Sequence, residues 1–357
     1  MRQLLVGGLL SSALLFSGGG ACAPAAGPAA APTAAPNAAA PAAAPTSPTE
    51  AAPPAPLQQF ELPLASQNAT VLPLWMAAEQ GIFQRYGLDV TLVYLSPSTA
   101  TQALQSGSVP VAATGGSTVT AYVGGASELV YVGGVSNKAP YRVVVRPDIL
   151  RMEDLRGKSV GLGAPGASPT VAMAELLRRN GMEPDRDVMF TYLRESSATV
   201  AALLSGSVQA IVMGSPQADY ALSEGNRLLL DMRDLNLPIL GINISSRRDQ
   251  VERDPELVRR VLMAYVEGIQ LARDRPEDAI PTLMRGAQVD DRGLAELAYK
   301  EYSAIWDPWP SEAGIQTLLD SMDVPAARTV RPAEMIDDHF LRELEQSGWL
   351  AAHYKTP

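Results

Sequence analysis

The sequence predicts an α/β protein of two lobes, each built on a mainly parallel β-sheet covered by helices. Three observations support this fold class. Predicted strands alternate with predicted helices from residue 60 to residue 246, as in parallel sheets. A segment of sixteen residues recurs about one hundred residues later. The length of 357 residues also exceeds that of one ordinary domain. Two crossings between the lobes, near residues 146–150 and 231–238, are expected to form a hinge.

The first 56 residues are expected to lie outside the folded lobes. Residues 1–21 combine one Arg, a short apolar run and small residues, which is the layout of a secretory signal peptide. Cys22, the only cysteine, follows directly, and its position resembles a bacterial lipoprotein processing site. That resemblance implies lipidation of Cys22; an ordinary signal peptide that happens to contain a cysteine is the alternative. Residues 22–56 are mostly Ala and Pro and predict a disordered tether.

Residues 57–148 are assigned to the first part of lobe 1. Its polar loop at residues 66–70 follows the first strand and precedes a helix at residues 74–79. A second helix is expected at residues 101–105, and a third begins after the small-residue loop at residues 114–118. The expected strands are residues 60–65, 89–95, 109–113, 129–132 and 141–145.

Residues 149–236 are assigned to lobe 2, whose central stretch is MEDLRGKSVGLGAPGASPT at residues 152–170. A buried strand at residues 159–162 leads through a small-residue loop to a helix at residues 171–179. Free N–H groups and the positive end of the helix dipole at such a junction suit an anion or a polarised carbonyl. The alternative is that Ser168 or Thr170 only caps the helix. Further strands are expected at residues 188–192, 210–213 and 227–230, with helices at residues 199–204 and 216–224.

An internal repeat indicates that the two lobes are related. QALQSGSVPVAATGGS at residues 102–117 parallels AALLSGSVQAIVMGSP at residues 201–216. Both stretches are interpreted as a helix, a Ser-Gly-Ser-Val turn, a strand and a loop. Ligands of parallel sheets gather at the carboxyl ends of the strands. We therefore expect the two loops, Gly116-Ser117 and Gly214-Ser215, to line a cleft from opposite sides.

Residues 237–357 are assigned to the return of the chain into lobe 1. Residues 237–246 are expected to form a strand, and amphipathic helices follow from residue 255 onward. Trp306, Trp309 and Trp349 are expected to pack between these helices. Trp75, one turn into the helix after the first polar loop, is the better candidate for contact with a ligand.

Composition excludes several classes of function. The formal net charge of −10 and the absence of a basic cluster argue against a nucleic-acid partner. His339 and His353 are the only histidines, so neither a zinc or iron site nor a Ser-His-Asp triad is expected. We therefore expect no cofactor, no metal and no catalytic residue. Three cations, Lys138, Arg142 and Arg194, are either counter-charges for an anion or solvated surface charges.

Four stretches resemble one known family. They are AAEQGIFQRYGLDVTLV at residues 77–93, ALQSGSVPVA at 103–112, EDLRGKSVGLGAPGAS at 153–168 and ALLSGSVQAIV at 202–212. In this order they resemble the ABC-importer solute-binding proteins for sulfonates, taurine, nitrate and thiamine-pyrimidine precursors, the NMT1/THI5-like group. The resemblance implies a type II periplasmic-binding-protein fold that holds its ligand between the lobes.

The resemblance also implies a set of ligand-binding residues. By position they are Asn68, Thr70, Gly116, Ser117, Thr118, Ser168, Pro169, Thr170, Gly214 and Ser215. Trp75 and Tyr141 are added as apolar or stacking walls. Gly214 stands where taurine and nitrate binders often carry an aromatic residue, so a wider pocket wall is expected there.

Together these features predict an exported lipoprotein, periplasmic or at the cell surface, that is anchored through Cys22. It is expected to be a monomer that captures a small organic solute, sulfonate-like or carboxylate, and passes it to an ABC permease and its ATPase. Hinge closure on the ligand is the expected mechanism. A pyrimidine or another heterocyclic solute is the alternative ligand. A periplasmic sensor partner or a THI5-like biosynthetic enzyme is the alternative of another class.

Overall fold

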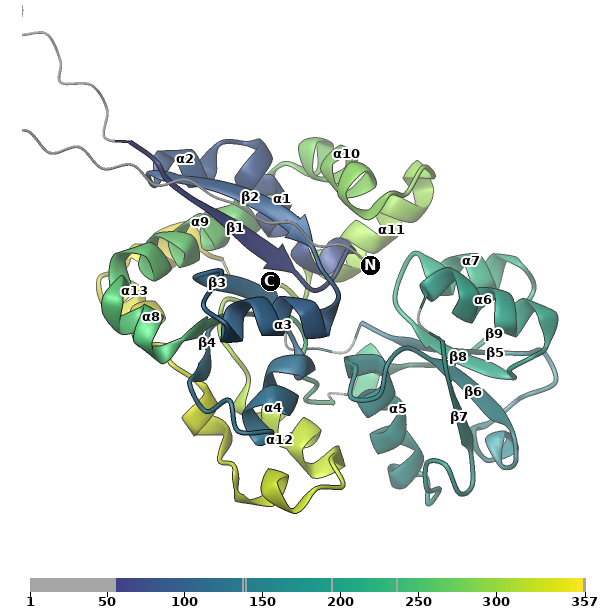
Figure 1. Cartoon of the computed structure of the whole chain (residues 1–357). Coiled ribbons are helices and arrows are strands. Elements are labelled where there is room, and N and C mark those ends of the chain that lie inside the picture. Colours follow the sequence, from purple (N-terminus) through teal and green to yellow (C-terminus); the bar gives the residue numbers. More distant parts are fainter. Residues whose placement is uncertain (1–55, 137, 139, 194, 236, 356–357) are drawn as a thin grey trace, which may run out of the picture. The chain divides into compact units, whose positions relative to one another are not determined.

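The computed structural model describes residues 56–136, 138, 140–193, 195–235 and 237–355 (Figure 1). The predicted signal peptide, Cys22 and all but the last residue of the Ala/Pro-rich tether lie outside the described residues, as does Arg194. These features remain predictions.

The first sheet contains five strands in the order β2-β1-β3-β10-β4 (Figure 1). Their bounds are β1 Gln58–Leu64, β2 Leu88–Tyr94, β3 Val111–Thr114, β4 Leu129–Gly134 and β10 Asn243–Arg247. The strands β2, β1 and β3 pair in parallel, whereas β10 is antiparallel to both of its neighbours. Four strands therefore run in one direction and only β10 runs in the other.

The second sheet repeats this arrangement in the order β7-β6-β8-β5-β9. Its strands are β5 Arg142–Val145, β6 Ser159–Leu162, β7 Met189–Tyr192, β8 Ala210–Met213 and β9 Arg227–Asp231. Here β5 is the antiparallel strand, between β8 and β9. The predicted α/β class with two mainly parallel sheets is confirmed. The two strands of the sequence repeat, β3 and β8, occupy the same central position in their sheets.

The strand at residues 142–145 was assigned to lobe 1, and this assignment is wrong, because the strand pairs within the second sheet. All four of its residues are buried, so an uninterrupted apolar run suits the middle of a sheet covered on both faces. The first crossing therefore lies at residues 135–141 rather than at 146–150. The second follows the 3-10 helix η3 Met232–Leu235 and ends at β10.

The two crossings lie side by side. The N–H groups of Val135 and Ser136 both donate to the Ile242 carbonyl, at 3.0 and 3.1 Å. A Cβ atom at Gly241 would lie 2.2 Å from the Ser136 carbonyl oxygen, so only glycine permits this approach. Two adjacent segments that connect two lobes are the arrangement of a hinge.

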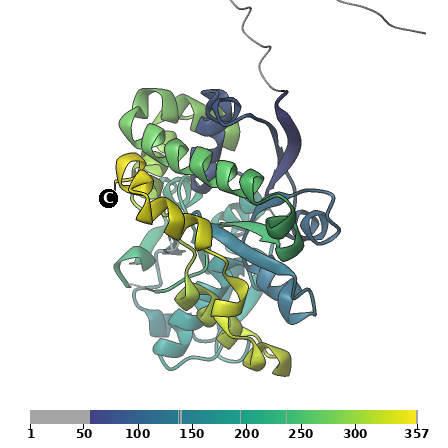
Figure 2. The same ribbon diagram turned by 90° about the vertical axis from the view of Figure 1, so that its left-hand side faces the viewer.

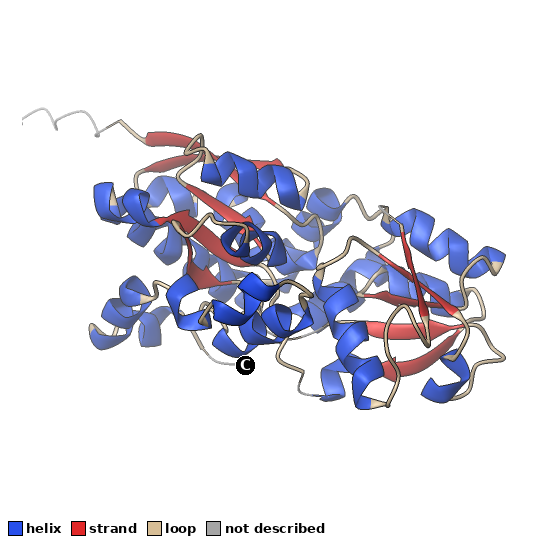
Figure 3. Cartoon of the chain, turned by 60° about the horizontal axis from the view of Figure 1, so that its bottom comes forward, coloured by secondary structure: helices blue, strands red, loops and turns tan. Residues whose placement is uncertain are grey.

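Helices cover both faces of each sheet (Figure 3). In the first lobe α1 and the C-terminal helix α9 (Pro255–Asp274) pack on one face and α3 and α4 on the other. In the second lobe α5 lies opposite α6 and α7. The helices of this part of the chain are α1 Leu72–Glu79, α2 Ile82–Arg85, α3 Pro97–Gln105, α4 Gly116–Val123, α5 Ser168–Arg179, α6 Ser196–Ser205 and α7 Gln217–Ser223. Short 3-10 helices are η1 Ala69–Val71 and η2 Met152–Leu155.

The C-terminal third is helical, as predicted. It comprises α8 Arg248–Arg253, α9 Pro255–Asp274, α10 Pro276–Ala287, α11 Arg292–Ser303, α12 Glu312–Ser321, α13 His339–Gln346 and α14 Trp349–His353, with 3-10 helices η4 Pro325–Thr329 and η5 Pro332–Met335. The last two helices pack on α9 (Figure 2). There Arg259 pairs with Glu343 at 2.5 Å and lies over the Phe340 ring. None of the described helices is long and apolar enough to cross a membrane.

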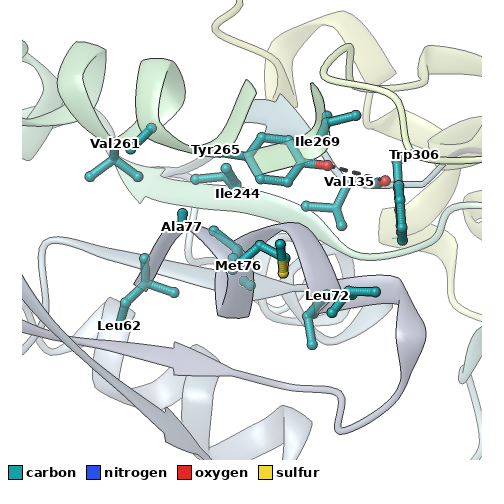
Figure 4. Packing of buried hydrophobic residues seen from close by; sticks show 14 of the residues in the cluster. Leu62, Leu72, Met76, Ala77, Val135, Ile244, Val261, Tyr265, Ile269 and Trp306 are labelled. Atoms are coloured by element: carbon teal, nitrogen blue, oxygen red, sulfur yellow. Dashed lines mark hydrogen bonds between the residues drawn. The ribbon is translucent and has the colours of Figure 1, made fainter. Parts of the chain in front are cut away.

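Each lobe has its own core. The larger core joins β1 and β10 to α1 and α9 through Leu62, Met76 and Ile244 (Figure 4). Tyr265 lies in this core and its hydroxyl donates to the Val135 carbonyl at 3.3 Å. Trp306 is fully buried, which confirms its predicted packing role. Burying each large apolar side chain contributes about 1.5–3 kcal/mol, so these cores supply most of the stability of the lobes.

Candidate functional site

The loop after β3 is fixed by hydroxyl groups inside the first lobe. Thr114 Oγ1 hydrogen-bonds to Thr118 Oγ1 and to Ser245 Oγ, both at 2.6 Å. The Tyr131 hydroxyl donates to the Gly115 carbonyl at 2.7 Å, and burial raises the pKa of Tyr131 well above its usual value. Thr118 is fully buried. Thr118 was predicted to contact a ligand, but its buried side chain supports the loop from within.

The start of α4 faces the second lobe. A Cβ atom at Gly116 would lie 2.8 Å from the Gly166 carbonyl oxygen, which belongs to the loop before α5. Ser117 is tied to its own lobe by a 2.8 Å hydrogen bond with Thr101. The structure therefore brings two of the predicted loops together at Gly116.

The loop before α5 is held by side chains of its own first turn. The Ser168 hydroxyl donates to the Leu240 carbonyl at 2.5 Å and the Thr170 hydroxyl donates to the Ala164 carbonyl at 3.0 Å. Pro169 lies between them in the first turn, and the N-cap is Ala167, which makes no side-chain capping bond. The alternative that Ser168 or Thr170 caps the helix is therefore wrong. The first-turn N–H groups keep their capacity for an acceptor from outside the helix.

Four hydroxyl groups converge from separate segments, and we call Thr70, Tyr141, Ser168 and Tyr302 the hydroxyl cluster. Burial raises the pKa of Tyr141 to about 12, and the neighbouring Ser168 hydroxyl works against this shift. Burial also raises the pKa of Tyr302, Tyr141 adds to the increase, and the Thr70 hydroxyl opposes it. These effects link Ser168 to Tyr141, Tyr141 to Tyr302 and Tyr302 to Thr70. Three of them were predicted from the sequence and Tyr302 was not.

Tyr302 fills the space at Gly214. A Cβ atom at Gly214 would lie 2.5 Å from the Tyr302 hydroxyl oxygen and 3.1 Å from the Pro140 carbonyl oxygen. The expectation of a wider wall at Gly214 is therefore wrong, because a tyrosine from α11 occupies that space. Residue spacing marked α11 only as an amphipathic helix, and no local motif distinguished Tyr302 from a packing residue.

Charged side chains lie next to the loop that follows β8. We call Arg142, Asp219, Asp231, Arg233 and Glu301 the charge cluster. Arg142 contacts Asp219 at 2.6 Å, Asp231 at 3.6 Å and also Glu301, whose other partner is Arg233 at 3.4 Å. The expectation that Arg142 is a free counter-charge or a solvated surface charge is wrong. Its side chain is 9% exposed and its guanidinium is paired with three carboxylates, because a buried cation requires such partners.

Ser215 belongs to this charged environment. It is 1% exposed, and its hydroxyl donates to Asp219. Burial raises the pKa of Asp231, but the Arg233 hydrogen bonds and the nearby Arg142 outweigh burial and hold that pKa below its usual value. The predicted ligand residue Ser215 is therefore engaged inside the second lobe.

Comparison with known proteins identifies the family. The profile of the NMT1/THI5-like family matches residues 68–279, more than half of the chain. The chain belongs to the NMT1/THI5-like family. All four stretches that carried the resemblance lie within the matched region, and the resemblance is confirmed. A search of curated proteins finds no match.

Solved structures share the fold of this family member. A protein from Bordetella bronchiseptica RB50 is 20% identical, with a TM-score of 0.68, over 81% of this chain and 97% of that one. The aliphatic sulphonate-binding protein SsuA from Escherichia coli is 22% identical, with a TM-score of 0.66, over 79% and 92%. The nitrate-binding protein NrtA from Synechocystis PCC 6803 is 15% identical, with a TM-score of 0.65, over 82% and 89%. These likenesses confirm the periplasmic-binding-protein fold.

Two predicted residues of this NMT1/THI5-like chain have structural roles. The Asn68 side chain accepts a hydrogen bond from the Thr70 N–H at 3.0 Å and so caps η1. The Trp75 ring lies against α10, where a Cβ atom at Gly286 would approach it to 2.5 Å. Asn68 therefore positions Thr70, and Trp75 occupies a packing position.

Lys138 lines a cavity beside the charge cluster. The cavity measures about 370 Å³ and is also lined by Arg233, Leu297, Lys300, Glu301, Ala304 and Ile305. Glu301 Oε2 is buried and has no hydrogen-bond partner within the part of the chain that the structure describes. In the same part of the chain, no group of His, Cys, Asp and Glu side chains is arranged to hold a metal.

Proposed function

We propose that this protein is an extracytoplasmic solute-binding protein of an ABC importer. The observation that carries the proposal is that polar loops of both lobes meet beside the adjacent crossings: Gly116 approaches Gly166, and Tyr302 of the hydroxyl cluster reaches Gly214. Polar groups that converge at the carboxyl ends of strands are typical of ligand sites in α/β folds. Membership in the NMT1/THI5-like family and the sulphonate- and nitrate-binding neighbours support the same function.

The proposed mechanism is closure about the crossings. Thr70 and Tyr302 come from the first lobe, whereas Ser168 and Gly214 come from the second. A solute that touches all of them interacts with both lobes only when the lobes are together. Its binding therefore shifts the population toward the closed form, and the permease recognises that form.

The proposed solute is a small organic anion of the sulfonate or carboxylate type. Its acceptor oxygens would meet the hydroxyl groups of Thr70, Tyr141 and Tyr302 and the uncapped N–H groups of α5, since Arg142 is already paired with carboxylates and the Ser168 hydroxyl donates to Leu240. The rings of Tyr141 and Tyr302 favour a planar heterocycle as the second candidate, because aromatic faces stack on such solutes. We propose binding without chemical conversion of the solute.

The proposed partners are an ABC permease and its ATPase. Lipidation of Cys22 would hold the protein at the membrane, with residues 22–56 as a tether, and the binding body would act as a monomer. Mass spectrometry of the mature protein tests the anchor. An acylated N-terminal Cys22 supports it, and an unmodified N-terminus contradicts it.

A thermal-shift screen tests the binding function. Purified protein is heated with sulfonates, carboxylates, nitrate, pyrimidines and flavins, and the compounds are then recovered and identified. A solute that binds only the folded state at one hundred times its Kd adds about 2.7 kcal/mol of stability. A stabilising compound recovered unchanged supports the proposal. Absence of binding, or recovery of an altered compound, contradicts it.

A further inference from the structure

Tyr302 joins the two lobes at one point. It lies on α11 of the first lobe, is 1% exposed, and its hydroxyl oxygen reaches the loop that follows β8 of the second lobe. The backbone at Gly214 has no left-handed φ, so the conformation of the chain does not require glycine there. The available space does require glycine, because a Cβ atom at this position would lie 2.5 Å from the Tyr302 hydroxyl oxygen and 3.5 Å from Tyr302 Cζ. The absence of a side chain at Gly214 therefore leaves the space that the Tyr302 hydroxyl occupies.

The end of α11 is fixed on both sides of Tyr302. The preceding residue, Glu301, pairs with Arg142 of the second lobe. Four residues later the Trp306 indole donates to the Ala69 carbonyl at 3.0 Å and so ties this end of α11 to η1. Tyr302 is thus held between the loop that presents Thr70 and the loop that contains Gly214, and its position does not depend on exposed contacts.

We propose that Tyr302 is a specificity-determining residue of the binding site. Its ring limits the length of solute that fits toward Gly214, and its hydroxyl offers a hydrogen bond to the solute beside Thr70 and Tyr141. The solutes selected are compact anions with a short apolar part. This inference rests on the proposed function and adds to it the residue that sets the size of the solute.

A series of straight-chain alkanesulfonates, from methanesulfonate to octanesulfonate, tests the inference. Binding is measured by calorimetry on the intact purified protein and on Tyr302→Ala. We expect the wild type to prefer the short members. Tyr302→Ala should shift the ratio of affinities toward the long members by about tenfold, since one or two methylenes in an apolar pocket account for such a factor.

Tyr299→Phe is the matched control. Tyr299 lies on the same helix one turn earlier, and its hydroxyl donates to the Ala272 carbonyl at 2.8 Å inside the first lobe. This variant should keep the wild-type preference. An unchanged preference in Tyr302→Ala, or an equal change in both variants, overturns the inference.

A double-mutant cycle tests the contact itself. Gly214→Ala should weaken binding by about tenfold, because its Cβ atom meets the Tyr302 hydroxyl. Adding Tyr302→Phe removes that oxygen and leaves the milder 3.1 Å approach to the Pro140 carbonyl oxygen, so the double variant should recover most of the loss relative to Tyr302→Phe alone. Failure of this rescue overturns the inference. If no solute binds the wild type, the proposed function fails first, whereas binding with an unchanged size preference refutes only the role of Tyr302.

Discussion

The loops that follow β3 and β8 have similar sequences but are held by different chemistry. In the first lobe the loop is fixed by neutral hydroxyl groups, with Thr114 at the centre of hydrogen bonds to Thr118 and Ser245. In the second lobe the corresponding loop is fixed by charge, because Ser215 donates to Asp219, which pairs with Arg142. The two copies of the repeat are therefore stabilised differently, one by neutral hydrogen bonds and the other by charged groups.

The difference lies in how far each network extends. The hydroxyl network stays inside the first lobe, whereas the charge cluster reaches α11 of the first lobe through Glu301. If the lobes separate, Arg142 keeps Asp219 and Asp231 as partners, and Glu301 moves into water. The second-lobe loop is thus the one whose surroundings change on opening, at a modest cost because no buried cation is left unpaired.

Arg142→Met should have the largest effect. It leaves Asp219, Asp231 and Glu301 around an apolar side chain, and removing one partner of a buried ion pair typically costs about 3–5 kcal/mol. Chemical denaturation should show a free energy of unfolding lower by that amount. Arg85→Met is the control, because Arg85 is 61% exposed in its pair with Glu267 and should lose less than about 1 kcal/mol. Equal losses in the two variants would refute the buried charge cluster.

Glu301→Gln should have a smaller effect on stability and should also increase the separation of the lobes. A charge-assisted hydrogen bond contributes about 1.5–3 kcal/mol, and Arg142 retains its two other carboxylates. We expect a lower Tm and a larger radius of gyration of the ligand-free protein by small-angle scattering, because the pair between the lobes is weakened. Glu343→Gln, which breaks the pair with Arg259 within the first lobe, should leave the radius unchanged. A Glu301→Gln protein as compact as the wild type would contradict this role.

Thr118→Val should cost about 1 kcal/mol, the usual net value of one neutral hydrogen bond. Thr114 keeps its bond with Ser245, so the rest of the first-lobe network survives. The measurement is the free energy of unfolding, compared with that of Thr120→Val. Thr120 lies in the same helix and donates to the Gly116 carbonyl at 3.1 Å, but it is exposed. A loss no greater than in Thr120→Val would show that the buried network does not support the loop.

The smallest expected effect is a steeper fall of the Tm with pH in the acid range. The folded-state pKa of Asp231 is below its usual value, so its contribution is fully present above the unfolded pKa of about 3.9. This contribution disappears as the pH falls through the folded-state pKa. The Tm of the wild type should therefore drop more steeply below about pH 4 than the Tm of Asp231→Asn. Parallel profiles would contradict the assignment.

Local sequence predicted most of the secondary structure and part of the site. Alternating apolar runs and Gly-rich turns placed the strands and helices, and the repeat pointed to the equivalent strands β3 and β8. Thr70 and Ser168 were predicted because they follow strands or begin helices, and such positions are visible in the order of residues. Tyr141 was predicted as a stacking wall.

The missed features depend on distant parts of the chain. Tyr302 and Glu301 matter because α11 meets the second lobe, and nothing in the spacing of α11 records that contact. Arg142 was interpreted as a surface cation, since its partners Asp219 and Asp231 lie far along the chain. The strand at residues 142–145 was given to the wrong lobe because an apolar run does not reveal which sheet it enters.

The strand β5 enters the second sheet, and β10 returns to the first sheet after the second lobe. This topology also fixes the order in which the first sheet is completed. The place between β3 and β4 stays vacant until β10 has been made, and the whole second lobe lies between β4 and β10 in the chain. The facing edges of β3 and β4 therefore remain unpaired until the chain beyond the second lobe reaches the first sheet. Unpaired edges bind other strands readily, so a chain in which β10 has not yet joined the sheet is prone to association through β3 and β4.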